Sequence, residues 1–138
     1  MSIVQTQTTS FKKELYQGIH DLSTDTIKIA LYTGNADLNE ATTVYSATNE
    51  VSGTGYTAGG QVMTGVAISS SESVAYANWA NVVWTAALTA RCALIYNASK
   101  GNKSVAVLDF GSDKTSTTTF TITMPANTST TALIRSSN

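Results

Sequence analysis

Apolar and polar residues alternate along most of the chain with a period of two, which predicts β-strands. The alternation is clearest from Ile27 to Leu31 and from Leu88 to Tyr96, where every second side chain would face the same side of a sheet. Residues 105–110 are apolar almost throughout, as in a strand buried on both faces. Polar segments containing glycine separate about eight such runs, so we expect an all-β fold: an antiparallel β-sandwich, a jelly roll or a short barrel.

Helical periodicity is confined to one segment near the N-terminus, predicted to be a short helix over residues 10–22. Its apolar residues fall on a single stripe: Phe11, Leu15, Ile19 and Leu22. Ser10 is the expected N-cap. Gly18 weakens a helix by about 1 kcal/mol relative to alanine, so tertiary packing must hold this one. Residues 1–9 are polar and without period, which predicts an extended N-terminal arm.

A long polar segment, residues 34–60, follows the first clear strand. It is rich in Asn, Asp, Gly and Thr, and loops of this length in compact domains are usually functional or ordered by a partner. Tyr45 and Tyr56 are large side chains for a loop, so we expect them to pin it to the rest of the domain. Because the sequence shows neither a repeat nor a linker, residues 10–138 are predicted to form a single β domain.

Composition narrows the classes of partner. Charged residues make up only 12% of the chain and the formal net charge is −1. The sequence therefore lacks the excess of Lys and Arg that binding to nucleic acid or to a membrane surface requires. The N-terminal residues lack the apolar run of a signal peptide, and we expect synthesis and folding in the cytoplasm. Cys92 is the one cysteine and lies in an apolar stretch, so it is read as a buried side chain.

Several motifs match catalytic patterns in letters but lack the required context. Gly53 to Ala58 fits a dinucleotide fingerprint, yet it follows a polar loop and precedes a strand, which predicts a turn. Asp109, Phe110 and Gly111 match the metal-binding motif of protein kinases, but the chain is too short to be a kinase. His20 suits the end of the predicted helix. The acidic residues are scattered along the chain. Asp109 and Asp113 can be considered as calcium ligands, but their spacing is not that of an EF-hand loop. We therefore expect no enzyme activity, no cofactor and no metal.

Interface residues are the remaining candidates. Arg91 is predicted on the strand face opposite Cys92. There it would either contact another subunit, since Arg is enriched at interfaces, or lie on a strand face exposed to solvent. The residues predicted to contact partners come from the helix stripe, the loop and this strand: Phe11, Leu15, Ile19, Tyr45, Tyr56 and Arg91.

Six segments resemble small virion structural proteins of tailed bacteriophages, of the head decoration or cementing type. The resemblance is carried by residues 10–15 (Ser-Phe-Lys-Lys-Glu-Leu), 19–33, 45–51, 53–60, 93–97 (Ala-Leu-Ile-Tyr-Asn) and 105–111. It implies a domain on the outer surface of the assembled head that bridges major capsid subunits as a dimer or trimer.

Two other functions follow from the same residues. Related sequences are also labelled tail or fibre components, so the alternative is a module that contacts the host surface through Tyr45 or Tyr56. A small hydrolase of the host envelope would instead depend on a carboxylate such as Asp109.

Overall fold

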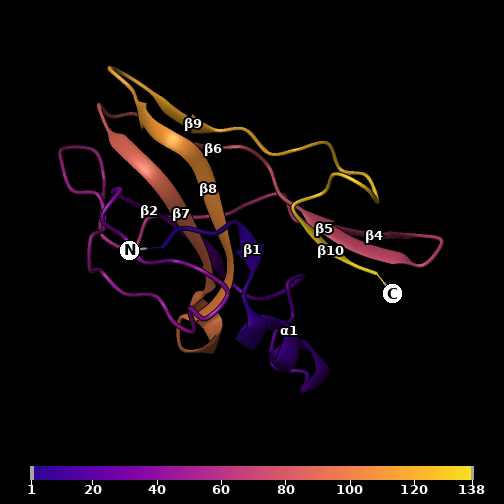
Figure 1. Ribbon diagram of the computed structural model, residues 1–138. Coiled ribbons are helices and arrows are strands. Elements are labelled where there is room, and N and C mark those ends of the chain that lie inside the picture. The colour runs from indigo at the N-terminus through magenta and orange to yellow at the C-terminus, as the bar shows by residue number, and fades with distance from the viewer. Residues whose placement is uncertain (1, 138) are drawn as a thin grey trace.

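The computed structural model describes residues 2–137 and consists mainly of antiparallel strands (Figure 1). The elements in chain order are β1 (Thr6–Gln7), α1 (Thr9–Tyr16), β2 (Ile27–Tyr32), β3 (Gln61–Val62), β4 (Ala67–Ser71), β5 (Val74–Asn78), β6 (Val82–Trp84), β7 (Thr89–Asn97), a 3-10 turn η1 (Ala98–Lys100), β8 (Lys103–Thr115), β9 (Phe120–Ile122) and β10 (Ile134–Ser136). The predicted all-β class with one short α-helix is confirmed. Two strands of only two residues each, β1 and β3, bring the number above the predicted eight.

The strands form three sheets. The largest has the order β1-β8-β7-β2-β3, with the long β7–β8 hairpin at its centre. A three-stranded sheet has the order β10-β5-β4, and β6 pairs with β9. In Figure 1 the β4–β5 hairpin extends outward from the body of the domain.

The main core lies on one face of the large sheet, where it includes side chains from α1, β6 and β9 and single residues of β5 and β10, Ala77 and Ile134. Trp84 of β6 is 1% exposed, and its ring packs edge-on against Phe120 of β9 with centroids 6.2 Å apart. Ile29 and Ile95 join this core from β2 and β7, and Phe11 joins it from α1. Each such side chain contributes roughly 1.5–3 kcal/mol through the apolar surface that it buries.

The other face of the large sheet is covered by the loop between β2 and β3. Ala36 and Leu38 of the loop pack on Tyr32, Leu94 and Val107, and all five are buried. The central strands are therefore buried on both faces, as the apolar run of β8 predicted.

The helix is shorter than predicted, ending at Tyr16 instead of Leu22. Gly18 has a φ of 71°, which is the left-handed region that glycine adopts at low cost. The amide of Ile19 donates to the carbonyl of Glu14 at 3.1 Å, and that of Gly18 to Leu15 at 3.1 Å. This pattern is the Schellman motif, so Gly18 ends the helix and does not merely weaken it.

The helix also begins earlier than predicted. Thr8, and not Ser10, is the N-cap, and its hydroxyl accepts a hydrogen bond from the amide of Phe11 at 3.3 Å. Ser10 instead occupies the first turn.

The predicted N-terminal arm is extended but lies against its own domain. Thr6 and Gln7 pair with Val107 and Ala106 of β8, and the amide of Val4 donates to Leu38 at 3.0 Å. These contacts supply its hydrogen bonds within the chain, so the arm from residue 2 onward is held against its own domain. Met1, the first residue of the predicted arm, and the C-terminal Asn138 lie outside the described residues.

Candidate functional site

Glu50 holds the long loop in place through two tyrosines. The hydroxyls of Tyr45 and Tyr56 donate to the two oxygens of its carboxylate, at 2.6 and 2.5 Å, and the amide of Gly59 donates to it at 2.8 Å. The Tyr56 hydroxyl also accepts from the amide of Leu31 in β2, at 2.9 Å. The expectation that Tyr45 and Tyr56 pin the loop is confirmed, and sequence reasoning missed Glu50 as their partner.

Two sheet tyrosines complete this cluster. The hydroxyl of Tyr96 donates to the carbonyl of Gly59 at 2.5 Å, and that of Tyr32 donates to Ser46 at 2.6 Å. The rings of Tyr45 and Tyr96 stack with centroids 4.7 Å apart. We call Tyr32, Tyr45, Glu50, Tyr56 and Tyr96 the tyrosine cluster.

The tyrosine cluster keeps its hydroxyls protonated. Burial, and then the negative charge of Glu50, raise the pKa of Tyr96 to about 12. Burial followed by the hydrogen bond to Glu50 also raises the pKa of Tyr45 and of Tyr56. These phenols therefore act as hydrogen-bond donors at neutral pH, and their hydroxyls bond to acceptors within the chain.

The predicted helix stripe divides between core and surface. Phe11 is fully buried against the ring of His20, with centroids 4.9 Å apart, and Ile19 is half-buried. Leu15 is 36% exposed, and its neighbour Tyr16 is 94% exposed. Of the three stripe residues proposed as an interface, only Leu15 lies on the accessible face of α1, where Tyr16 joins it.

Arg91 is engaged within the chain. Its guanidinium bonds to the carboxylate of Asp109, at a point where the β7–β8 register shifts. The amide of Gly111 and then Arg91 hold the pKa of Asp109 below its ordinary value. The carboxylate of Asp109, which the hydrolase alternative would use, is therefore ionised at neutral pH and paired with Arg91.

The single histidine also belongs to an internal network. His20 Nε2 lies 2.8 Å from Glu14, and the amide nitrogen of Asn97 lies 3.0 Å from Nδ1. The same amide donates to Asp25, which also pairs with Lys100 at 2.9 Å. These bonds join the end of α1 to β7 and η1, which is a structural role.

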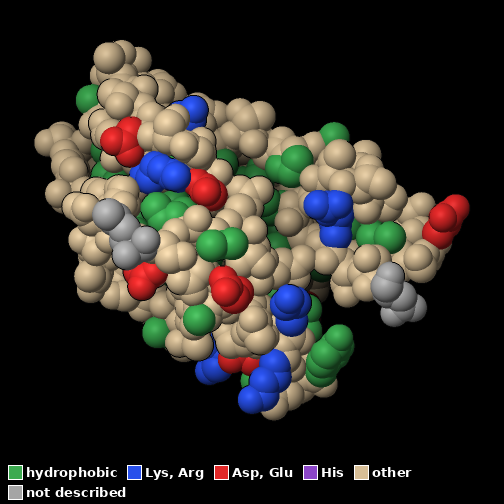
Figure 2. All heavy atoms as spheres, in the orientation of Figure 1, with side chains coloured by type: hydrophobic (Ala, Val, Ile, Leu, Met, Phe, Trp, Pro, Cys, Tyr) green, Lys and Arg blue, Asp and Glu red, His purple; other side chains and the backbone are tan. Residues whose placement is uncertain are grey.

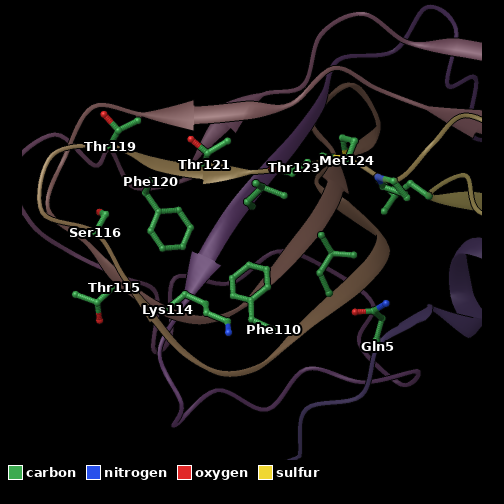
Figure 3. A pocket seen from close by; sticks show the side chains of 14 residues that line it. Gln5, Phe110, Lys114, Thr115, Ser116, Thr119, Phe120, Thr121, Thr123 and Met124 are labelled. Carbon is green, nitrogen blue, oxygen red and sulfur yellow. The ribbon is translucent and has the colours of Figure 1, made fainter.

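An open groove of about 670 Å³ lies between β8 and β9 (Figure 3). Its apolar lining comes from both strands and from the chain after them: Leu108, Phe110, Phe120, Ile122, Met124 and Leu133. Threonines surround the apolar floor, and Lys114 is the one charged side chain among its described lining residues. In the described part of the chain β9 pairs with β6 alone, so its other edge faces this groove.

Sequence reasoning did not find the groove. The alternation of Phe120 and Ile122 with threonines indicated a strand with one apolar face, but not that the neighbouring edge would lack a partner. Gly111 has a φ of 83° and lies within the register shift of β8, but it does not line the groove and gives no signal for it in the sequence.

The visible surface is largely uncharged. Figure 2 shows a few Lys, Arg, Asp and Glu side chains scattered among neutral polar atoms, without a dominant patch of one sign. Among residues 2–137 no group of three His, Cys, Asp or Glu side chains is placed to hold a metal ion. No helix within that range has both the length and the apolar character needed to span a membrane.

Comparisons with known proteins identify no relative. No family model matches the chain, and no curated protein or solved structure matches it significantly.

Proposed function

We propose that this protein is a head decoration protein of a tailed bacteriophage, which binds the outside of the assembled shell and bridges major capsid subunits. The observation that carries the proposal is the pair of exposed apolar side chains on α1, Tyr16 and Leu15. They lie in and beside the segment 10–15, where the resemblance to decoration proteins begins. The protein would act by binding, without making or breaking a bond.

The α1 face has the features of a protein contact. Tyr16 and Leu15 border a shallow hollow of about 340 Å³ between α1, β1 and β10, which Lys12 and Arg135 also line. Tyrosine and arginine are enriched among the residues that dominate binding energy at interfaces. The Schellman turn and the cap at Thr8 fix both ends of α1, so its backbone loses little entropy when a partner binds.

The tethered loop supports the same role. The tyrosine cluster holds residues 33–60 against the sheet before any partner arrives, so binding requires little further ordering of the backbone. On a shell with many equivalent sites, each weak contact adds to the stability of the bound, closed lattice.

The experiment is a binding assay on heads that lack this protein. Wild-type protein should bind at a fixed number of copies per head and raise the temperature at which the heads release DNA. Tyr16→Ala should weaken binding by at least about tenfold if Tyr16 is a hot-spot residue. The matched control is Gln17→Ala, an exposed change one residue along the chain. Equal binding by both variants would remove α1 from the proposed interface.

Imaging of the source virion by electron cryomicroscopy separates the two structural roles. Density repeated over the head supports decoration, whereas density only at the tail tip would support the tail or fibre alternative. That alternative was expected to use Tyr45 or Tyr56, but both hydroxyls are bound to Glu50, whereas Tyr16 is exposed and could provide an aromatic contact.

A further inference from the structure

The outer strand of the three-stranded sheet, β4, is an unprotected edge. Ile68 is 53% exposed, and the serines that follow it are exposed as well. Proteins usually protect such edges with a charged residue, a proline or a bulge. The segment Ala67–Ser71 contains no charge and no proline, and it pairs with β5 in unbroken register.

The groove between β8 and β9 offers what such a strand needs. The free edge of β9 supplies main-chain donors and acceptors, and residues 119–125 line the groove consecutively. Below that edge, Phe110 and Met124 are only partly buried, although they pack against the main core. An extended segment entering here would add a strand to β9 and cover this apolar floor.

Charge favours the β4–β5 hairpin as the occupant. Glu72, in the exposed turn of that hairpin, is the only charged residue between Ala67 and Asn78. Lys114 is the only charge among the groove's described lining residues. The two charges are opposite, and the rest of the hairpin can enter the groove without removing a charge from water. Because the hairpin extends outward from the body in Figure 1, the groove that it can reach belongs to another molecule.

We infer that the chain self-associates head to tail, with the β4–β5 hairpin of one copy in the β8–β9 groove of the next. Such a contact joins two different surfaces, so it closes into a ring or continues as a filament. The inference rests on this chain alone and uses a surface separate from the α1 face. Its failure would therefore leave the proposal of head binding intact, and the reverse also holds.

The first measurement is the mass of the purified full-length protein in solution, by analytical ultracentrifugation over a wide concentration range. We expect the weight-average mass to rise above the 14.5 kDa of a monomer as the concentration increases. A constant monomer mass up to about 1 mM, which corresponds to a very weak association, would overturn the inference.

Exchanging the two charges tests the pairing directly. Lys114→Glu and Glu72→Lys should each weaken association by roughly threefold to tenfold, because each puts like charges together. The double variant should recover most of the loss. Glu40→Lys, an exposed charge reversal elsewhere, is the control. A double variant that associates no better than either single variant would overturn the pairing of these surfaces.

Ile68→Asp tests the apolar contact and should abolish association, because it would place a charge in the groove. Val62→Asp, at a β3 position with similar exposure of 50%, should leave association unchanged. Both side chains are exposed, and circular dichroism should show that both variants are folded. Equal effects of the two changes would contradict the inference. So would a monomeric protein in which Ile68→Asp weakens binding to heads, since the hairpin would then contact the capsid.

Discussion

Replacing Glu50 with alanine tests whether the tyrosine cluster holds the long loop. The carboxylate accepts three hydrogen bonds, from Tyr45, Tyr56 and the amide of Gly59. Tyr56 and Gly59 are buried, so two donors lose their acceptor where water does not readily replace it. Each buried donor left unpaired costs about 1–3 kcal/mol. The expected loss in the free energy of unfolding is therefore roughly 2–6 kcal/mol, with a smaller share from the half-buried Tyr45.

The loop can also open without global unfolding, so two measurements are needed. Urea denaturation gives the change in global stability, and hydrogen exchange followed by mass spectrometry gives the free energy of opening residues 33–60. We expect Glu50→Ala to accelerate exchange in this loop far more than in β7 or β8. Glu40→Ala is the control, because Glu40 is an exposed acidic residue of the same loop. Its backbone carbonyl accepts a hydrogen bond from the amide of Thr9, which the substitution keeps.

A change in stability below about 0.5 kcal/mol, together with unchanged exchange of the loop, would refute this reasoning. It would mean that the apolar contacts of Ala36 and Leu38 with the sheet are sufficient to hold the loop. Tyr56→Phe separates the contributions further. It keeps the ring but removes the acceptor of the buried Leu31 amide, which should cost about 1–3 kcal/mol by itself.

Three further predictions concern other parts of the domain. Gly60→Ala should destabilise the protein far more than Gly18→Ala, although both residues have positive φ. A Cβ at Gly60 would lie 1.8 Å from the carbonyl oxygen of Ile29. Gly18 has open space around it, so Gly18→Ala should lower the free energy of unfolding by only about 1–2 kcal/mol, as measured by thermal unfolding. Burial opposes ionisation of Asp25, but bonds from Asn97, the Asp21 amide and Lys100 outweigh it and lower its pKa to about 2. The stabilising effect of ionised Asp25 is therefore complete above the ordinary pKa near 4 and is lost as the pH falls toward 2. Asp25→Asn should make the free energy of unfolding less dependent on pH in this acid range. An unchanged pH dependence would contradict this reasoning. Cys92 is fully buried, and burial also raises the pKa of its thiol to about 11, so a thiol reagent should modify it only when the protein opens. Rapid modification of the folded protein would be inconsistent with this structure.

The local elements of this protein follow from its sequence. Alternation between Leu88 and Tyr96 predicts a strand because side-chain direction in an extended chain depends only on residue spacing. The same reasoning located the helix, but it misplaced the helix end, because Gly18 was counted as a weak interior residue. The role of Tyr45 and Tyr56 as anchors could also be predicted, since large aromatic side chains are seldom left in solvent.

The tertiary structure decided which of these elements meet. Glu50 could not be identified from sequence as the partner of these tyrosines, because its carboxylate meets Tyr56 only when the loop folds back onto β2. Phe11 and Leu15 share one helical stripe, yet only the packing of α1 against the sheet determines that Phe11 is buried and Leu15 exposed. The groove likewise exists because β8 and β9 belong to different sheets and their facing edges are not joined. Periodicity depends on neighbouring residues alone, whereas sheet order and open edges depend on many weak contacts between distant parts of the chain.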